Sequence, residues 1–153
     1  MVHMTEIKVG DKAPDFTLPD QDGKLLTLFS LRGKVIVLYF YPKDFTSGCT
    51  KEACHFRDAY EDFTDAGAEV IGVSADSQES HRRFRDTYLL PFSLLSDEKE
   101  EVKKLYGVSG HLLPARVTFV IDKVGVVRHV FSSKIDMKAH VDEAMRVLKT
   151  LSQ

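Results

Sequence analysis

The sequence predicts an α/β protein in which a central mixed β-sheet is flanked by helices. Two continuous apolar runs, "KVIVLYFYP" (34–42) and "EVIGVSA" (69–75), and a segment of helical spacing between them support this prediction. Uninterrupted runs of β-branched and aromatic residues are typical of strands that are buried on both faces. Buried strands that alternate with helices indicate a sheet covered by helices.

The first half of the chain contains a hairpin, the first buried strand and a long helix. Residues 16–18 and 25–28 form the N-terminal β-hairpin, with a turn at Asp22-Gly23. The strand at 35–41 follows. From Thr50 to about Ala66 the apolar residues recur every three or four positions, which predicts a helix that ends before Gly67.

The second half continues the alternation of strands and helices. The expected elements are a strand at 69–75, a helix capped by Ser77 and ending near Tyr88 before Pro91, a strand at 92–95, a helix at 99–106, two antiparallel strands within 116–131, and a helix capped by Asp136 that runs to about Leu151. A terminal hairpin followed by a helix makes the predicted sheet thioredoxin-like. Because no linker interrupts the pattern, we expect one domain over residues 1–153, with residues 1–4 treated as a candidate cloning remnant.

Composition narrows the class of protein. The chain has 153 residues, 43% of them hydrophobic, with a net charge of -2 and a pI near 6.3. The absence of a basic excess argues against a nucleic-acid partner. No apolar stretch approaches the ~20 residues that span a bilayer, and the N-terminus lacks the apolar core of a secretory signal. We therefore expect a soluble, cytoplasmic protein without a membrane partner; a plastid transit peptide already removed would leave no trace in this sequence.

The two cysteines lie close together in "YPKDFTSGCTKEAC". Two cysteines do not make a disulfide framework in a domain of this size. Cys49 follows a central strand and lies at the predicted helix N-terminus, where free N–H groups and the helix dipole stabilise a thiolate. Cys49 is therefore a candidate nucleophile, whereas Cys54, about one turn further along, fits either a chemical role or that of a core residue.

Several motifs carry a resemblance to a known family. "PKDFTSGC" resembles the peroxiredoxin signature at Pro42, Thr46 and Cys49, and "GCTKEAC" together with "PARVTFVID" is similar to the peroxiredoxin Q subfamily, also called bacterioferritin comigratory protein. The similarity extends over nearly the whole chain. Ser47 stands where the family usually has proline.

The resemblance implies a thiol-dependent peroxidase that reduces hydrogen peroxide and organic hydroperoxides. Cys49 would become a sulfenic acid, and Cys54 would resolve it as an intramolecular disulfide. Thioredoxin or a glutaredoxin-like dithiol would restore the thiols. The subfamily also implies a monomer that needs no cofactor or metal.

The resemblance further assigns roles to the residues around the thiol. Thr46 would direct its hydroxyl at the thiolate and the peroxide, and Pro42 would shield the pocket from water. Arg116 would lie over Cys49, stabilise its thiolate and donate to the peroxide oxygens. Glu52 either holds Arg116 in place or is a solvated surface residue.

Other functions stay open from the residues alone. A thioredoxin-type thiol–disulfide oxidoreductase is the main alternative, although it favours two residues between its cysteines and this chain has four. A metal site of Cys49, Cys54 and His55 lacks a nearby fourth ligand. A binding module on the same scaffold is a further alternative. The remaining histidines of interest are interpreted as ordinary surface or packed residues: His81, His111, His129 and His140.

Overall fold

The computed structural model describes residues 7–108 and 116–151, so residues 1–4 and His111 lie outside the described part of the chain. The strands are β1 (Thr17–Pro19), β2 (Leu25–Thr27), β3 (Val35–Phe40), β4 (Ala68–Ser74), β5 (Ser93–Ser96), β6 (Val117–Ile121) and β7 (Val127–Ser132). The helices are α1 (Ser47–Asp65), α2 (Gln78–Tyr88), α3 (Glu101–Leu105), α4 (Met137–Leu151) and a 3₁₀ turn, η1 (Leu28–Leu31).

The main sheet has the order β5-β4-β3-β6-β7, and β3 lies at its centre. β3, β4 and β5 pair in parallel, whereas β6 pairs antiparallel with both β3 and β7. β1 and β2 form a separate antiparallel hairpin. The predicted mixed sheet, N-terminal hairpin and thioredoxin-like arrangement are confirmed.

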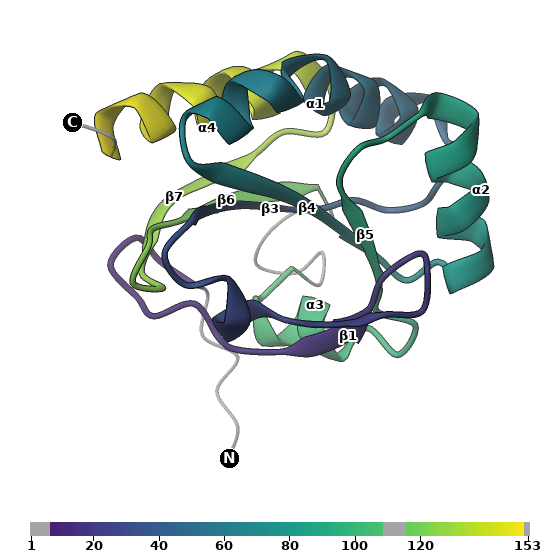
Figure 1. The fold of residues 1–153 in the computed structure, drawn as a ribbon, viewed down its shortest axis with the longest axis horizontal. Helices are drawn as coiled ribbons and strands as arrows, with labels where there is room; N and C mark the ends of the chain where they lie inside the picture. The colour runs from purple at the N-terminus through teal and green to yellow at the C-terminus, as the bar shows by residue number, and fades with distance from the viewer. Residues whose placement is uncertain (1–6, 109–115, 152–153) are drawn as a thin grey trace.

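Helices and the hairpin cover opposite faces of this sheet. In Figure 1, α1 and α4 lie side by side over one face, while the β1 hairpin and α3 lie on the other. β3 supplies both faces, because Val37 and Tyr39 join the core beneath α1 and α4, whereas Leu38 and Phe40 join the core beside α3. All six residues of β3 are buried, as its continuous apolar run predicts.

The start of α1 differs from the prediction. The helix begins at Ser47 and not at Thr50, because Thr46 is extended (φ -76°, ψ 153°) and its carbonyl accepts a 2.9 Å bond from the Thr50 N–H. Ser47 and Gly48 are poor helix formers, so their composition did not indicate a helical turn. Cys49 is therefore the third residue of α1.

Two further elements differ in extent. η1 was not predicted; the Phe29 N–H at its start donates to the Asp15 carboxylate at 2.9 Å. α3 is shorter than the predicted 99–106, since Glu100 takes a left-handed conformation (φ 57°) immediately before it. The edges of the other strands are displaced from the prediction by about one residue.

The predicted caps are confirmed. The Ser77 side chain accepts from the Ser80 N–H ahead of α2, and Asp136 accepts from the Ala139 N–H ahead of α4. Gly67 follows the end of α1 in a positive-φ conformation (84°), which glycine adopts without a Cβ penalty.

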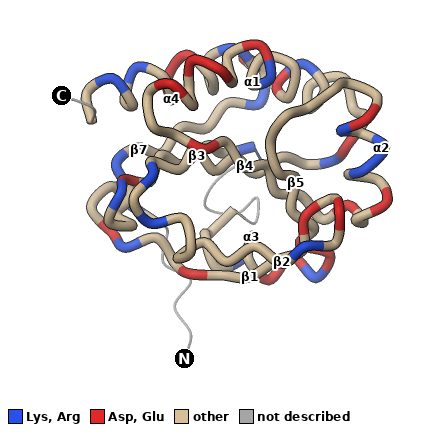
Figure 2. Tube along the Cα trace, in the orientation of Figure 1, with Lys and Arg blue, Asp and Glu red and all other residues tan. Residues whose placement is uncertain are grey.

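Charged residues of both signs cover the helices. Figure 2 shows Lys and Arg interleaved with Asp and Glu along α1, α2 and α4, as the composition predicts. Within the described part of the chain, no helix combines the length and the apolar character that crossing a membrane requires.

Candidate active site

Cys49 is a free, buried thiol in the first turn of α1. Its side chain is 1% exposed, and no disulfide links it to Cys54. The helix starts a few residues after the carboxyl end of β3, the edge at which open α/β sheets bind ligands. The first N–H groups of α1 have no partner within the helix and lie in the same turn as Cys49.

Arg116 reaches Cys49 from the adjacent strand. It immediately precedes β6, whose first residue, Val117, pairs with Phe40 at the carboxyl end of β3. Arg116 Nη2 donates to Cys49 Sγ at 3.2 Å. Gly48 leaves room for this contact, since a Cβ on that residue would lie 3.1 Å from Nη2.

Glu52 occupies the other side of the guanidinium. Arg116 Nη1 donates to Glu52 Oε1 at 2.6 Å, and the Glu52 side chain is fully buried. Burial raises the pKa of Glu52 to about 7, against the opposing attraction of Arg116. Burial lowers the pKa of Arg116, but the negative charges of Glu52 and Cys49 reverse this and raise it overall. The interpretation of Glu52 as a solvated surface residue is therefore wrong.

A buried histidine lies behind this pair. His140 of α4 is 0% exposed, and its Nδ1 lies 3.5 Å from Glu52 Oε2. The same Nδ1 lies 2.8 Å from Thr118 Oγ1, and Nε2 lies 2.9 Å from the Ser133 carbonyl oxygen. The sequence predicts an ordinary surface or packed residue at His140. A histidine on the apolar face of a helix gives the same sequence pattern whether it only packs in the core or also contacts a site residue.

Pro42 and Thr46 lie on the exposed loop between β3 and α1. The Thr46 hydroxyl donates to the Lys43 carbonyl at 2.8 Å, which fixes its position one turn before Cys49. Ser47 is the first residue of α1, the position at which proline is most readily accommodated. This explains how a serine and the family's usual proline can both occupy that position.

A hydrogen-bonded cluster anchors the base of the loop. The Asp44 carboxylate accepts from Tyr41 at 2.6 Å and from Ser80 at 2.9 Å, and it lies 2.7 Å from His81 Nδ1. Asp44 and His81 are buried, so this cluster ties the loop to α2. His81 thus has a structural role beyond that of an ordinary packed residue.

The metal site suggested by the sequence is not formed. Within residues 7–108 and 116–151, the grouping of potential ligands that the structure brings together is Asp44, Asp76 and His81, without either cysteine. Asp76 already accepts from the Asp44 N–H and the Ser74 hydroxyl at 2.8 and 2.7 Å. Cys54 is half-buried on α1, five residues beyond Cys49.

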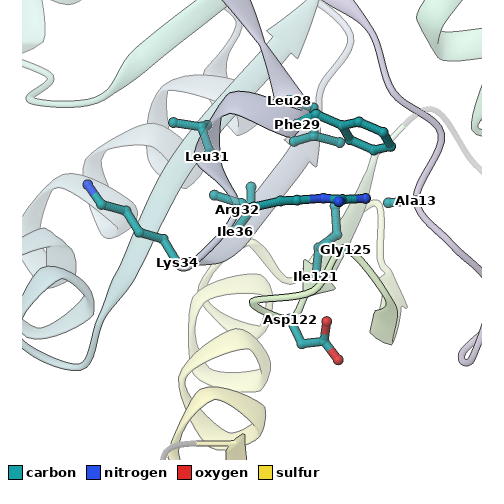
Figure 3. A pocket seen from close by; sticks show the side chains of 10 residues that line it. All are labelled: Ala13, Leu28, Phe29, Leu31, Arg32, Lys34, Ile36, Ile121, Asp122 and Gly125. Atoms are coloured by element: carbon teal, nitrogen blue, oxygen red, sulfur yellow. The ribbon is translucent and has the colours of Figure 1, made fainter.

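The hollow in Figure 3 lies elsewhere. It is bounded by Ile36 at the start of β3 and Ile121 at the end of β6, with the Arg32 guanidinium 4.2 Å from the centre of the Phe29 ring. Because Cys49 follows the opposite end of β3, this hollow does not belong to the thiol site.

Comparison with known proteins agrees with this geometry. The family model described as AhpC/TSA family matches residues 9–130. The chloroplastic peroxiredoxin Q of Arabidopsis thaliana is 51% identical over 147 residues, which cover 94% of this chain and 68% of that protein.

Solved structures are similar over nearly their whole length. The peroxidoxin BcpB of Mycobacterium tuberculosis is 39% identical, with a TM-score of 0.88 over 95% of this chain and 99% of that chain. The bacterioferritin comigratory protein of Xanthomonas campestris, described for its alkyl peroxide reduction activity, is 30% identical, with a TM-score of 0.83 over 96% and 98% of the two chains. The chain therefore belongs to the AhpC/TSA family and, within it, to the peroxiredoxin Q group of thiol-dependent peroxidases.

Proposed function

We propose that Cys49 is the residue that attacks the peroxide. The thiolate sulfur bonds to one peroxide oxygen, the O–O bond breaks, and the departing oxygen takes a proton to leave as water or an alcohol. Cys49 is left as a sulfenic acid. The contact of 3.2 Å between Arg116 Nη2 and Cys49 Sγ carries this assignment.

Arg116 has two tasks in this proposal. Its fixed charge stabilises the thiolate before the reaction, and its N–H groups donate to the oxygen on which negative charge develops. Glu52 binds the other end of the guanidinium and holds its plane toward Cys49. Pro42 and Thr46 would border the approach of the peroxide, as the family resemblance implies.

Cys54 is proposed as the resolving thiol, which requires α1 to open. On a regular helix, residues five apart have Cα atoms about 8.5 Å from one another. A disulfide tolerates at most about 7 Å. Because α1 is helical through both cysteines, its first turns must unwind before Cys54 displaces water from the sulfenic acid. A dithiol then restores both thiols.

Membership of the family supports a proposal for the substrate and the reductant. Alkyl peroxide reduction by the Xanthomonas campestris relative supports organic hydroperoxides, along with hydrogen peroxide, as substrates. We propose thioredoxin, or a glutaredoxin-like protein, as the electron donor. We also propose a monomer that forms one domain over residues 1–153. The chloroplastic relative supports a plastid location rather than the cytoplasm.

Single-cysteine variants test the two assignments. We expect Cys49→Ser to abolish peroxide consumption, whereas Cys54→Ser should consume about one equivalent and stop as a sulfenic acid that dimedone traps. Equal activity of the two variants would refute the assignment. A thiol–disulfide oxidoreductase would instead reduce disulfide substrates without consuming peroxide, so measuring both substrates separates the two functions.

The required unwinding has its own signature. In the reduced protein, the amides from Thr50 to Phe56 should exchange slowly, and in the oxidised protein they should exchange rapidly. Mass spectrometry of digested oxidised protein should show the Cys49–Cys54 link. Formation of that disulfide with unchanged amide protection would show that the helix does not need to open.

A further inference from the structure

We propose that Glu52 and His140 hold one shared proton behind Arg116, and that this proton keeps the positive charge of Arg116 available to the Cys49 thiolate. His140 is then a positioning residue that acts through Glu52. The proposal rests on Cys49 being the reacting thiol, and it adds a proton-holding function to the residues around it.

The geometry leaves room for a proton between the two side chains. Both are fully buried, and Glu52 Oε2 has no hydrogen-bond partner within the described residues. His140 Nδ1 lies 3.5 Å from this oxygen. A buried carboxylate oxygen without a donor is costly, and a proton between these two atoms removes that cost.

Ser133 fixes which nitrogen of the ring can take part. The Ser133 carbonyl can only accept, so the bond of 2.9 Å assigns a proton to His140 Nε2. Nδ1 is then the atom that gains or loses a proton, and it faces Glu52 Oε2 and the Thr118 hydroxyl. The Thr118 hydroxyl can donate to Nδ1 or accept from it, so it tolerates both states.

The charge of the pair is the same wherever the proton resides. A protonated Glu52 beside neutral His140 carries no net charge, and neither does ionised Glu52 beside protonated His140. With this proton present, Arg116 contributes one uncancelled positive charge opposite the thiolate. Without it, ionised Glu52 cancels that charge, and the thiolate becomes the excess charge in a buried site.

Burial favours the arrangement in which Glu52 holds the proton and His140 is neutral. Burial raises the pKa of Glu52 to about 7 despite Arg116, and burial lowers the pKa of His140 despite the bond to Ser133. Tyr39 of β3 is close enough to feel the same charges. Burial raises the pKa of Tyr39, and the negative charges of Glu52 and Cys49 raise it further, so the Tyr39 hydroxyl stays neutral. Two charges also act on His140: Arg116 lowers its pKa, and Asp136 raises it.

The pair titrates as a unit, with consequences for pH dependence. Well below pH 7 it holds the proton, and the rate of reaction of the thiolate with peroxide is at its maximum. As the pH rises above about 7 the proton leaves, and we expect the rate per thiolate to fall by about tenfold.

The test measures the second-order rate of peroxide reaction across pH 5.5–9 in the Cys54→Ser background, divided by the thiolate fraction from ultraviolet absorbance. Glu52→Gln keeps the contact with Arg116 but cannot ionise, so the fall above neutral pH should vanish. His140→Gln removes the second proton-holding atom, so the fall should begin at lower pH, and at pH 7 the rate should be up to about fivefold below that of the parent. His129→Gln is the matched control, because His129 packs against the same Phe131 ring as His140 and lies outside the site.

Two results would overturn the inference. One is a rate for Glu52→Gln that falls by about 100-fold at every pH, since ionised Glu52 would then be essential. The other is a His140→Gln profile that superimposes on that of the parent. If either variant fails to fold, infrared difference spectra of the parent between pH 6 and 9 remain decisive: either the carbonyl stretch of a protonated carboxyl or the ring bands of an imidazolium must disappear as the pH rises, and a spectrum without either change would refute the shared proton. A parent chain without peroxide reactivity would contradict the proposed function itself, and not this inference.

Discussion

Replacement of Arg116 by lysine separates its charge from its shape. Two nitrogens of the guanidinium serve two partners at once: Nη1 binds Glu52 at 2.6 Å and Nη2 binds Cys49 at 3.2 Å. Lysine has one nitrogen on a shorter reach, and we expect it to retain the carboxylate and lose the sulfur. A charge-assisted hydrogen bond is worth about 1.5–3 kcal/mol, so the rate with peroxide should fall by about 10- to 150-fold.

The assay compares two quantities in the same variant. The ultraviolet absorbance of the thiolate should persist, because the positive charge remains, while the second-order rate of peroxide consumption falls. Arg128→Lys is the matched control, since the exposed Arg128 side chain binds the Asp122 carboxylate at 2.7 Å. A rate for Arg116→Lys within about threefold of that of the parent would refute the two-partner argument.

Three other changes test neighbouring features. Glu52→Gln should flatten the pH dependence of the unfolding free energy. In the parent the folded-state pKa of Glu52, about 7, exceeds the ordinary 4.5, so the unfolding free energy should decline by up to about 3 kcal/mol as the pH rises between those values. Urea titrations at several pH values measure this decline. Gly48→Ala places a methyl 3.1 Å from Arg116 Nη2 and should slow peroxide consumption by about tenfold without lowering the melting temperature; an unchanged rate would show that Arg116 has room to move. Gly72→Ala places a methyl 2.9 Å from the Tyr39 ring and should cost about 1–3 kcal/mol in thermal unfolding, and an unaltered melting curve would contradict the tight packing there.

Elements with strong periodicity could be predicted from the sequence, whereas contacts across the fold could not. The apolar run of β3 leaves no alternative to a buried strand, so its bounds were nearly correct. The first turn of α1 was missed, since the propensities of Ser47 and Gly48 do not favour a helix. η1 depends on the side chain of Asp15, 14 residues from the N–H that it binds, and local patterns do not encode such pairs.

In the candidate site, too, local features could be predicted from the sequence and contacts between distant residues could not. Cys49 could be singled out because its place after a central strand is visible in the sequence. Arg116 is 67 residues away from it, and only the family resemblance brought the two together before the structure did. Whether Glu52 is buried depends on how α1, β6 and α4 meet, so the sequence left it open. His140 was missed for the same reason.

The long separation between Arg116 and Cys49 also governs when the thiol becomes reactive during synthesis. The cysteine leaves the ribosome early, but β6 must still be made and must pair beside β3 before the guanidinium arrives. A nascent chain that ends at α3 therefore exposes an ordinary thiol, which reacts slowly with peroxide. The order of the elements along the chain thus limits oxidation of a partly synthesised protein. Cys49 becomes reactive toward peroxide only after β6 has paired with β3 and Arg116 has reached the thiol.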